Sequence, residues 1–299
     1  MATSLDKACV GVAESRPRSS AMRQPPWVRR DSVNGMTHCG MECRLPSAAA
    51  LALVCGFATL GVAGVPDAQP PLKADIAVYS DYIERGLSYS RERYSLQGHV
   101  EYDAPLGLYG GAFFVHNSAI LTKETVEFDP YVGYVMRIND WTVDGGVFAW
   151  LYPHSRFDLS RNRYNTLEAT VDVTYKIVGV KIWYDIKNFW GLDERSAALN
   201  YGLNPNGSSK DSFYIDSHLN IPLPVDFLLK LHVGHQFIRN YGELDYTDWL
   251  LGFEKGLGHH LTIGGASTGT DARRSLYTDV HGLDLARGKW LVYFRRDLP

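Results

Sequence analysis

From Lys73 to the C-terminus, apolar and polar side chains alternate along successive stretches that are separated by turns. The clearest stretch is Leu167 to Ile177, where Leu, Ala, Val, Val, Tyr and Ile alternate with Glu, Thr, Asp, Thr and Lys. A period of two is the period of a β-strand with one apolar and one polar face. Repeated along a chain, such segments are typical of a transmembrane β-barrel, in which lipid-facing and lumen-facing residues alternate.

The alternation predicts twelve strands, an even number, as in bacterial single-chain barrels. Most of them are long enough to cross the hydrocarbon core of a bilayer as tilted strands. The predicted strands cover residues 74–84, 93–104, 108–117, 124–138, 141–152, 163–177, 180–190, 212–221, 225–238, 245–255, 259–269 and 289–297. The expected fold is therefore all-β: an antiparallel, up-and-down transmembrane β-barrel of about 12 strands.

Short and long connections alternate between these strands. The short ones are predicted at residues 105–107, 139–140, 178–179, 222–224 and 256–258. The others, apart from a brief one at 240–244, are longer and rich in Ser, Asn, Asp and Arg, and lie around residues 85–92, 118–123, 153–162, 191–211 and 270–288. Outer-membrane barrels have short periplasmic turns and longer outer loops, so both ends of the barrel are expected on the periplasmic side.

The turns also predict which residues pair and which face each side chain takes. A two-residue turn at 178–179 sets Tyr175 opposite Ile182 on the lipid face, and the turn at 139–140 sets Val135 opposite Asp144. Polar side chains on the other face are expected to line the lumen. These predicted pore-lining residues are Asp129, Arg137, Asp144, Glu168, Asp172, Lys176, Lys181, Asp185, Lys187, Asp216, Lys230 and Glu254.

A soluble β-sandwich or lipocalin-like barrel also alternates, but its apolar face points inward. The rhythm of the connections and the features of the N-terminal region favour the membrane barrel. Trp141, Tyr109 and Trp290 lie where an aromatic girdle at the membrane interface is expected.

The N-terminal region differs from the rest in composition. Arg44 precedes an apolar run over 48–65 that ends in small residues, which predicts a signal peptide over residues 41–68, cut near Gly64 or Ala68. A retained membrane anchor is the alternative. Residues 1–40, rich in Arg, Pro and Ser, are expected to be a disordered extension or a misassigned start. The barrel domain then covers residues 69–299, and it contains no cysteine, because the four cysteines are Cys9, Cys39, Cys43 and Cys55.

The formal charge of −3 and the lack of long runs of like charge give no reason to expect a nucleic-acid partner. The expected partners are outer-membrane lipids, the barrel-insertion machinery and small polar solutes, and the oligomeric state stays open. Acidic residues outnumber basic ones on the predicted inner face, which predicts a mild preference for cations. Twelve strands enclose a narrow bore, so the lumen charges either line a solute path or pair across strands and close it.

Candidate chemistry is sparse. His232 and His235 are three residues apart on a strand and face opposite ways, and the adjacent pair at 259–260 does the same, so neither a metal ion nor another cofactor is expected. The local cluster of His116, Asn117 and Ser118 is consecutive and cannot converge on one side, so no catalytic residue and no enzyme activity are predicted.

The pair Arg85-Gly86, with Asp81 nearby, is predicted at the end of the first strand. One interpretation is a contact at the rim that shapes the mouth of a pore. The favoured interpretation is a salt bridge between strand and loop, with a glycine that supplies a positive φ.

Several segments match one known family in the same order. They are Val78-Tyr-Ser-Asp-Tyr-Ile-Glu-Arg-Gly-Leu-Ser, Gln97-Gly98, Gly107-Leu-Tyr-Gly-Gly, Glu127-Phe-Asp-Pro-Tyr-Val-Gly-Tyr, Tyr152-Pro153, 164–175, Ile221-Pro-Leu-Pro, His232-Val-Gly-His-Gln and Asp245-Tyr-Thr-Asp-Trp. Over about residues 74–297 the chain resembles the TorF family of outer-membrane porins. The resemblance implies an outer-membrane barrel with a passive channel and brings no substrate with it.

Two positions depart from that family. Glu84 stands where the family has an aromatic residue, which we interpret as a change tolerated at the outer rim. The chain ends Phe294-Arg-Arg-Asp-Leu-Pro and not on a strand with a terminal Phe, which puts recognition by the insertion machinery in question.

The function predicted from the sequence is a porin-like channel of the cell outer membrane, exported with a cleaved signal peptide, for passive diffusion of small polar solutes or ions. Two alternatives remain. One is an outer-membrane enzyme acting on lipid or peptide, which requires a Ser/His pair within hydrogen-bond reach. The other is a plugged structural or adhesive barrel without transport.

Overall fold

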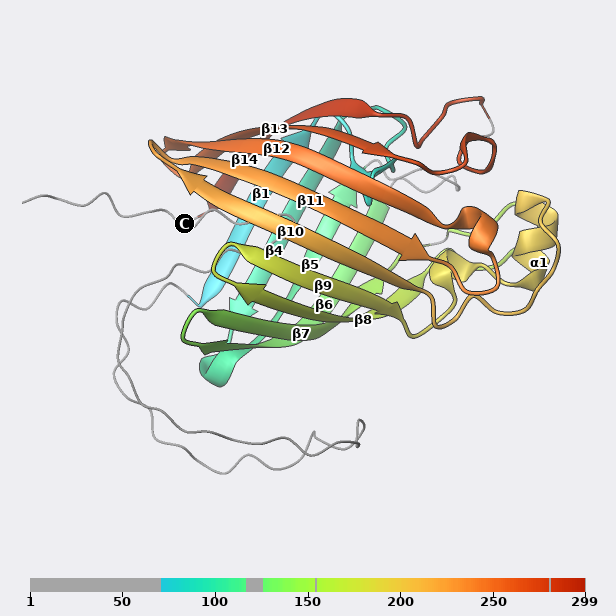
Figure 1. Cartoon of the computed structure of the whole chain (residues 1–299), viewed down its shortest axis with the longest axis horizontal. Helices are drawn as coiled ribbons and strands as arrows, with labels where there is room; N and C mark the ends of the chain where they lie inside the picture. Colours follow the sequence, from blue (N-terminus) through green and yellow to red (C-terminus); the bar gives the residue numbers. More distant parts are fainter. Residues whose placement is uncertain (1–70, 117–125, 154, 280, 299) are drawn as a thin grey trace, which may run out of the picture.

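The computed structural model describes residues 71–116, 126–153, 155–279 and 281–298. Over these residues, twelve strands form one closed antiparallel barrel, as predicted (Figure 1). The wall strands are β1 (Leu72–Tyr79), β4 (Ser95–Asp103), β5 (Leu108–His116), β6 (Val126–Ile138), β7 (Trp141–Trp150), β8 (Thr166–Tyr175), β9 (Val178–Asp185), β10 (Phe213–Leu223), β11 (Phe227–Phe237), β12 (Tyr246–Gly258), β13 (Leu261–Thr270) and β14 (Lys289–Leu298). The predicted signal peptide and the extension before it lie outside the described residues.

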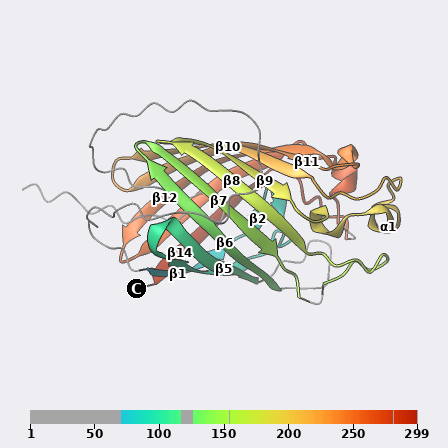
Figure 2. The ribbon, with the colours of Figure 1, turned by 90° about the horizontal axis from the view of Figure 1, so that it is seen from below.

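The strands follow one another around the barrel in sequence order, and β1 closes the wall by pairing with β14, with Ala74 opposite Leu298. They cross the wall obliquely (Figure 2), as the closure of a β-barrel requires. The start of β1 and the end of β14 lie at the same end as the short turns, and the longer connections lie at the other end (Figure 1). We call these the turn end and the loop end.

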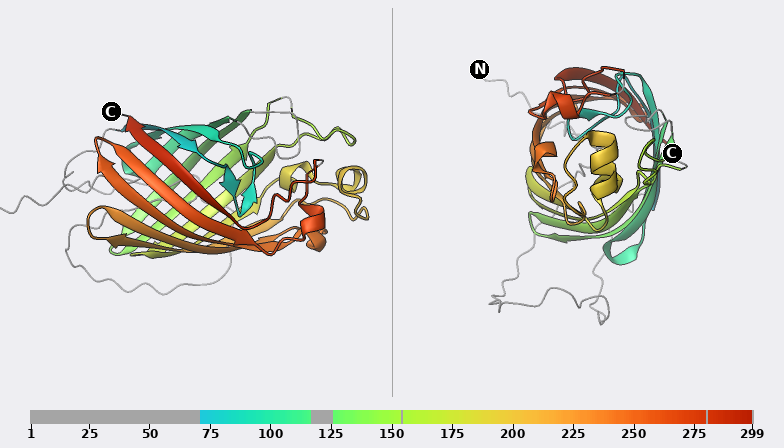
Figure 3. Two further views of the ribbon diagram at one scale, coloured as in Figure 1. Left: turned by 90° about the horizontal axis from the view of Figure 1, so that it is seen from above. Right: turned by 90° about the vertical axis from the view of Figure 1, so that its right-hand side faces the viewer.

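Small helical turns lie in the connections between the strands. The helix α1 (Glu194–Ser196) continues as a π-helical turn (Ala197–Tyr201), and both lie over the opening at the loop end (Figure 3). The 3-10 turns are Pro105–Gly107, Phe189–Gly191, Gly242–Leu244 and Arg274–Leu276. In the part of the chain that the structure describes, no helix has the length and apolar character needed to cross a bilayer.

The faces of the strands agree with the alternation in the sequence. On β8, Val171, Val173 and Tyr175 are exposed on the outside, with 50%, 37% and 41% of their surface accessible. Asp172, between them, points into the lumen and its side chain is 13% exposed. Trp141 and Trp290 are exposed on the outside, but the prediction for Tyr109 was wrong: it is buried in the lumen, where its hydroxyl donates to Asp144.

The register agrees with the prediction at one turn and not at another. Val135 pairs with Asp144 as expected. The turn between β8 and β9, however, occupies residues 176–177 and not 178–179, so Tyr175 pairs with Val178 and Ile182 with Val171. Because the error is an even number of residues, every side chain keeps its predicted face. The sequence shows no glycine at this turn, and Lys176 itself takes the left-handed conformation, with a φ of 54°.

Two other turns lie later than predicted, at residues 224–226 and 259–260. Pro222 pairs with Leu228 near the end of β10 and does not begin the turn. The glycines at 256–258 belong to β12, where the pairing shows a β-bulge. Non-glycine residues supply the positive φ angles of the actual turns: Val225, Asp226, His259 and His260.

Candidate functional site

The first strand was predicted to run to residue 84, but β1 ends at Tyr79 and the chain then turns into the barrel. There β2 (Ile83–Glu84) and β3 (Leu87–Ser88) form a two-stranded hairpin. Arg85 and Gly86 join these strands with φ angles of 47° and 76°, the combination that a tight hairpin turn needs. We call residues 81–90 the inner hairpin.

Hydrogen bonds close the base of the inner hairpin. One carboxylate oxygen of Asp81 accepts from the hydroxyls of Ser88 and Ser90, at 2.7 and 2.8 Å. The Ser90 hydroxyl also accepts from the backbone N–H of Tyr82. Asp81 therefore holds the hairpin together, and it is not the partner of Arg85 that the sequence suggested.

Arg85 is the centre of the site. Its Nη2 donates to both carboxylate oxygens of Glu168 on β8, at 2.8 and 3.0 Å, and its Nη1 donates to the side-chain oxygen of Gln236 on β11, at 2.8 Å. The Arg85 side chain is 4% exposed and that of Glu168 is fully buried. Arg85 thus links β8 to β11, which are separated in the wall by β9 and β10. Glu84, the residue before Arg85, is also buried. Both residues were predicted at the outer rim, and the structure places them inside the lumen.

Aromatic rings surround the guanidinium group of Arg85. Its carbon lies 4.6 Å from the ring centre of Tyr214, 5.3 Å from that of Trp190 and 5.5 Å from that of Trp183, within the range of cation–π attraction. Trp150 donates its indole N–H to Glu168 at 2.6 Å. These contacts compensate for removing both charges from water.

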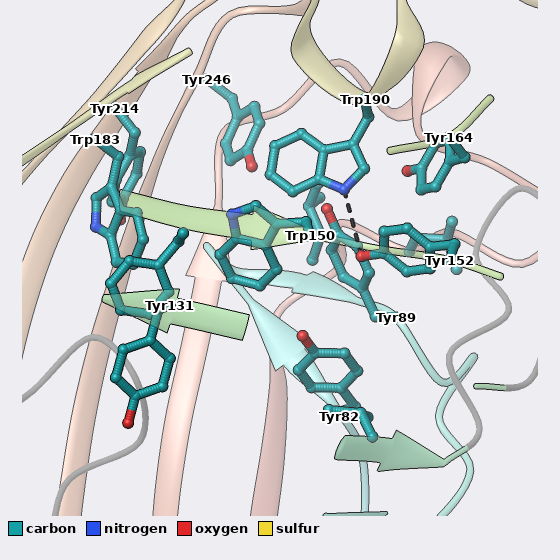
Figure 4. Close-up of a cluster of buried hydrophobic side chains, with 14 of the residues drawn as sticks. Tyr82, Tyr89, Tyr131, Trp150, Tyr152, Tyr164, Trp183, Trp190, Tyr214 and Tyr246 are labelled. Carbon is teal, nitrogen blue, oxygen red and sulfur yellow. Dashed lines mark hydrogen bonds between the residues drawn. The ribbon is translucent and has the colours of Figure 1, made fainter. Parts of the chain in front are cut away.

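Figure 4 shows how the aromatic cluster fills the barrel at this level. Tyr82 and Tyr89 come from the inner hairpin, Trp150 from the wall, and Trp190 and Tyr152 from the connections at the loop end. The indole of Trp190 donates to the Tyr152 hydroxyl at 3.3 Å. The cluster joins hairpin, wall and loops into one packed layer.

The lumen is closed at this layer. Glu127, Glu168, Gln236 and Asp248 point inward from four wall strands, and none of them has accessible surface. A water-filled channel would leave such side chains accessible, so the hairpin and the aromatic cluster fill the lumen here.

Other lumen charges pair along the wall. The Lys230 ammonium contacts Glu254, which also accepts from the Tyr293 hydroxyl. The Nε2 atom of His232 lies 2.6 Å from the Oδ2 atom of Asp248. In both ion pairs the partners come from the neighbouring strands β11 and β12.

The predicted pore-lining residues fall into three groups. Those buried inside the barrel are Asp129, Glu168, Lys181, Asp185, Asp216, Lys230 and Glu254. Asp144 and Asp172 are half-buried on the lumen side nearer the turn end. Arg137, Lys176 and Lys187 are exposed: the first lies near the end of β6, and the other two lie in connections outside the strands that were predicted to hold them.

Sequence reasoning missed Arg85, Gln236 and the aromatic side chains as parts of one site. One feature of the sequence could have indicated the inner hairpin. Arg85-Gly86 lies between two stretches that contain serine, and this composition is typical of a turn and not of a strand.

Replacing Gly86 with alanine is expected to weaken docking of the inner hairpin by about 1–3 kcal/mol. The new Cβ would lie 2.7 Å from the Cβ of Asp248, at a φ of +76°. Gly258→Ala is the matched control, because Gly258 has a φ of +78° but no described atom within 4 Å of its Cβ position. Urea unfolding of the refolded barrel should show the larger loss for Gly86→Ala, and equal losses would mean that the hairpin does not pack tightly against β12.

The hydroxyl–imidazole contacts bear on the enzyme alternative. His235 lies 2.8 Å from the Thr247 hydroxyl on the outer surface, and His218 lies 3.5 Å from the Thr174 hydroxyl. Both hydroxyls belong to threonine and not to serine, so neither contact is the Ser/His pair expected of a hydrolase. Residues 117 and 118 of the sequence cluster lie outside the described residues.

Comparison with known proteins gives a family. Residues 65–297 match the family Gcw_chp, described as a bacterial protein of unknown function. No curated protein sequence matches the chain. Similar solved structures include the NanC porin (12% identity, 76% of this chain, 100% of that chain, TM-score 0.48) and the KdgM porin (5%, 76%, 99%, 0.46). OccD3 (OpdP) of Pseudomonas aeruginosa is a further one (11%, 75%, 60%, 0.36). The family match covers most of the chain, and the protein therefore belongs to the Gcw_chp family.

Proposed function

We propose that the protein is an outer-membrane channel for small polar solutes or ions, and that the inner hairpin closes its lumen in this conformation. One observation carries the proposal: the lumen wall is charged, while the element that fills it is a loop hairpin held by non-covalent contacts. Buried charges add little to the stability of a purely structural barrel, because well-packed apolar side chains stabilise an interior as well or better. Charges on the wall are useful where water and ions enter once the hairpin leaves.

The outer surface supports the membrane location. Its exposed side chains include Val171, Ile182, Leu251 and Phe253 on the spanning strands, which suit a hydrocarbon environment. The resemblance of the sequence to the TorF family of porins points in the same direction.

The lumen charges favour cations. Buried carboxyl side chains of the lumen outnumber buried Arg and Lys side chains, of which the described residues include Arg85, Lys181, Lys230 and Arg295. An excess of negative charge in a confined space attracts cations and repels anions.

Planar bilayers with a salt gradient test the proposal. The wild-type barrel should show infrequent openings with a reversal potential on the cation side. A clear anion preference would contradict the charge argument. A correctly folded barrel that never conducts would favour the alternative of a plugged structural or adhesive barrel.

The openings should depend on pH through Glu84, which lies in the inner hairpin and outside the spanning strands. Burial raises the pKa of Glu84 from its ordinary value of 4.5 to about 7, although the neighbouring Arg85 opposes the shift. The docked hairpin therefore favours the protonated carboxyl, and docking weakens as pH rises between these two values. Glu127, Glu168 and Asp248, which face Glu84 from the wall, act in the same direction.

We expect the open probability to rise by roughly 10- to 100-fold between pH 5 and pH 8. Glu84→Gln cannot ionise at this position and should give a flatter profile over that range; burial also raises the pKa of Asp81 at the base of the hairpin, so a smaller slope remains. An open probability that falls with pH in the wild type, or an unchanged profile in Glu84→Gln, would contradict this role.

A further inference from the structure

The inner hairpin borders a cavity of about 60 Å³ within the lumen. On one side it is lined by the chain from Asp81 to Glu84, and on the other by side chains of the wall, among them Phe113, Asp129 and Tyr293. A single water needs roughly 10–15 Å³ of such space, so the cavity has room for a few waters or for a small organic ion.

Carboxyl side chains outnumber cationic side chains around this cavity. Three carboxyl side chains line it, those of Asp81, Glu84 and Asp129, against one cationic side chain, Lys230. The Lys230 ammonium is already in contact with Glu254, which lies outside the lining. The carboxyl groups of the lining therefore outnumber the cation available to them.

Two of these carboxyl groups have an oxygen without a hydrogen-bond partner among the described residues. They are Oδ2 of Asp81 and Oδ1 of Asp129, and the two residues are 4% and 3% exposed. The other oxygen of Asp81 is engaged by Ser88 and Ser90. A buried carboxylate oxygen without a partner is costly, and a cation with N–H donors would supply one.

Apart from Gln97, the other side chains of the lining are aromatic or aliphatic. Tyr79, Tyr82, Phe113 and Tyr293 contribute rings, and the rings of Tyr79 and Tyr293 stack with centres 4.7 Å apart. Leu250 adds an aliphatic surface. Aromatic faces attract cations, and apolar groups accommodate carbon but not a hydrated ion.

A metal ion fits this lining less well. Ca²⁺ takes six to eight oxygen ligands and Mg²⁺ keeps several waters. Within the described ranges, no group of three or more His, Cys, Asp or Glu side chains is arranged to hold a metal ion. A ligand with one positive charge, N–H donors and an apolar carbon suits the mixture of groups better.

We propose that the cavity is a binding site for a small primary ammonium ion. Its N–H donors bind Asp81 and Asp129, and its carbon packs against the tyrosine rings. The site depends on the docked hairpin and not on passage of solute through the barrel, so this inference and the proposed channel function can fail separately.

The test uses the full barrel in detergent micelles and saturation-transfer NMR of the methyl protons of methylammonium. Methanol, which has the same number of heavy atoms and no charge, is the matched probe. We expect transfer to methylammonium and little to methanol. Asp129→Asn and Asp81→Asn should each weaken methylammonium binding roughly tenfold, the effect of losing one charge-assisted hydrogen bond.

Asp226→Asn is the control variant, because it makes the same chemical change in an exposed turn between β10 and β11, and it should bind as the wild type does. A heat-modifiability gel verifies that each variant folds. Equal transfer to methylammonium and methanol in the wild type would overturn the proposal. So would complete displacement of methylammonium by an equal concentration of sodium, or wild-type binding in both aspartate variants. The comparisons with methanol and with sodium need no variant. None of the three measurements depends on conductance, so they test the binding site separately from the proposed channel.

Discussion

A barrel in which a two-residue Asn-Gly turn replaces residues 80–94 should conduct ions almost continuously under conditions where the wild-type barrel is mostly closed. The replacement is geometrically simple, because β1 and β4 are neighbours in the wall and Tyr79 pairs with Ser95. Asn-Gly suits the tight turn that joins two such strands. The variant removes the inner hairpin without shortening any wall strand.

The expected effect is large because the hairpin carries the link across the lumen. Arg85 connects β8 to β11, whereas the ion pairs Lys230–Glu254 and His232–Asp248 join neighbouring strands and lie along the wall. If the buried contacts of the hairpin contribute about 3 kcal/mol or more to closure, removing them raises the open fraction by at least about 100-fold.

Single-channel recording gives the result directly. The control replaces the exposed residues 204–206 at the loop end with Gly-Ser-Gly, which leaves the inner hairpin in place and should leave gating unchanged. A hairpin-less barrel that folds, as judged by heat modifiability, and still does not conduct would show that the wall itself closes the lumen.

The second large effect concerns stability. Arg85→Ala should destabilise the folded barrel by about 3–5 kcal/mol, because it leaves the fully buried Glu168 carboxylate without its counter-ion. Removing both charges in Arg85→Met/Glu168→Gln should restore much of that loss, since the uncompensated charge is then absent. Urea unfolding followed by tryptophan fluorescence is a suitable measurement, because Trp150, Trp183 and Trp190 surround the pair.

Arg287→Ala is the matched control. Arg287 forms an ion pair with Glu92 at the loop end, where its side chain is 56% exposed. Exposed pairs contribute about 0–1 kcal/mol, so this variant should unfold close to the wild type. Similar losses for Arg85→Ala and Arg287→Ala would contradict the central role of the buried pair.

The wall was predictable because the strands present apolar side chains on the outside and polar side chains toward the lumen. On β8, moving Val171 to the lumen side would also move Asp172 to the outside, so the alternation of the sequence determines the faces even where the register is predicted wrongly. The turn at 176–177 shows that the alternation does not determine the register. Lys176 takes a left-handed conformation that residue type does not indicate, and the tertiary pairing of β8 with β9 overrides the local preference.

The inner hairpin was not predictable in the same way. Residues 80–84 contain no glycine or proline to end a strand, so the prediction extends the first strand to Glu84, although the chain leaves the wall at Tyr79. What draws the segment inward is the set of partners for Arg85: Glu168 and Gln236 lie 83 and 151 residues further along the chain. Local periodicity contains no information on contacts at that separation.

Lipid accessibility along β8 tests the central claim most directly, because a membrane barrel must present its apolar face to the bilayer and its charged face to the lumen. Single cysteines at Val171, Val173, Asp172 and Thr174 can be labelled with a fluorophore, since positions 65–299 contain no native cysteine. In liposomes that contain nitroxide lipids, we expect strong quenching at 171 and 173 and weak quenching at 172 and 174. Strong quenching at 172 and 174 with weak quenching at 171 and 173 would contradict the account.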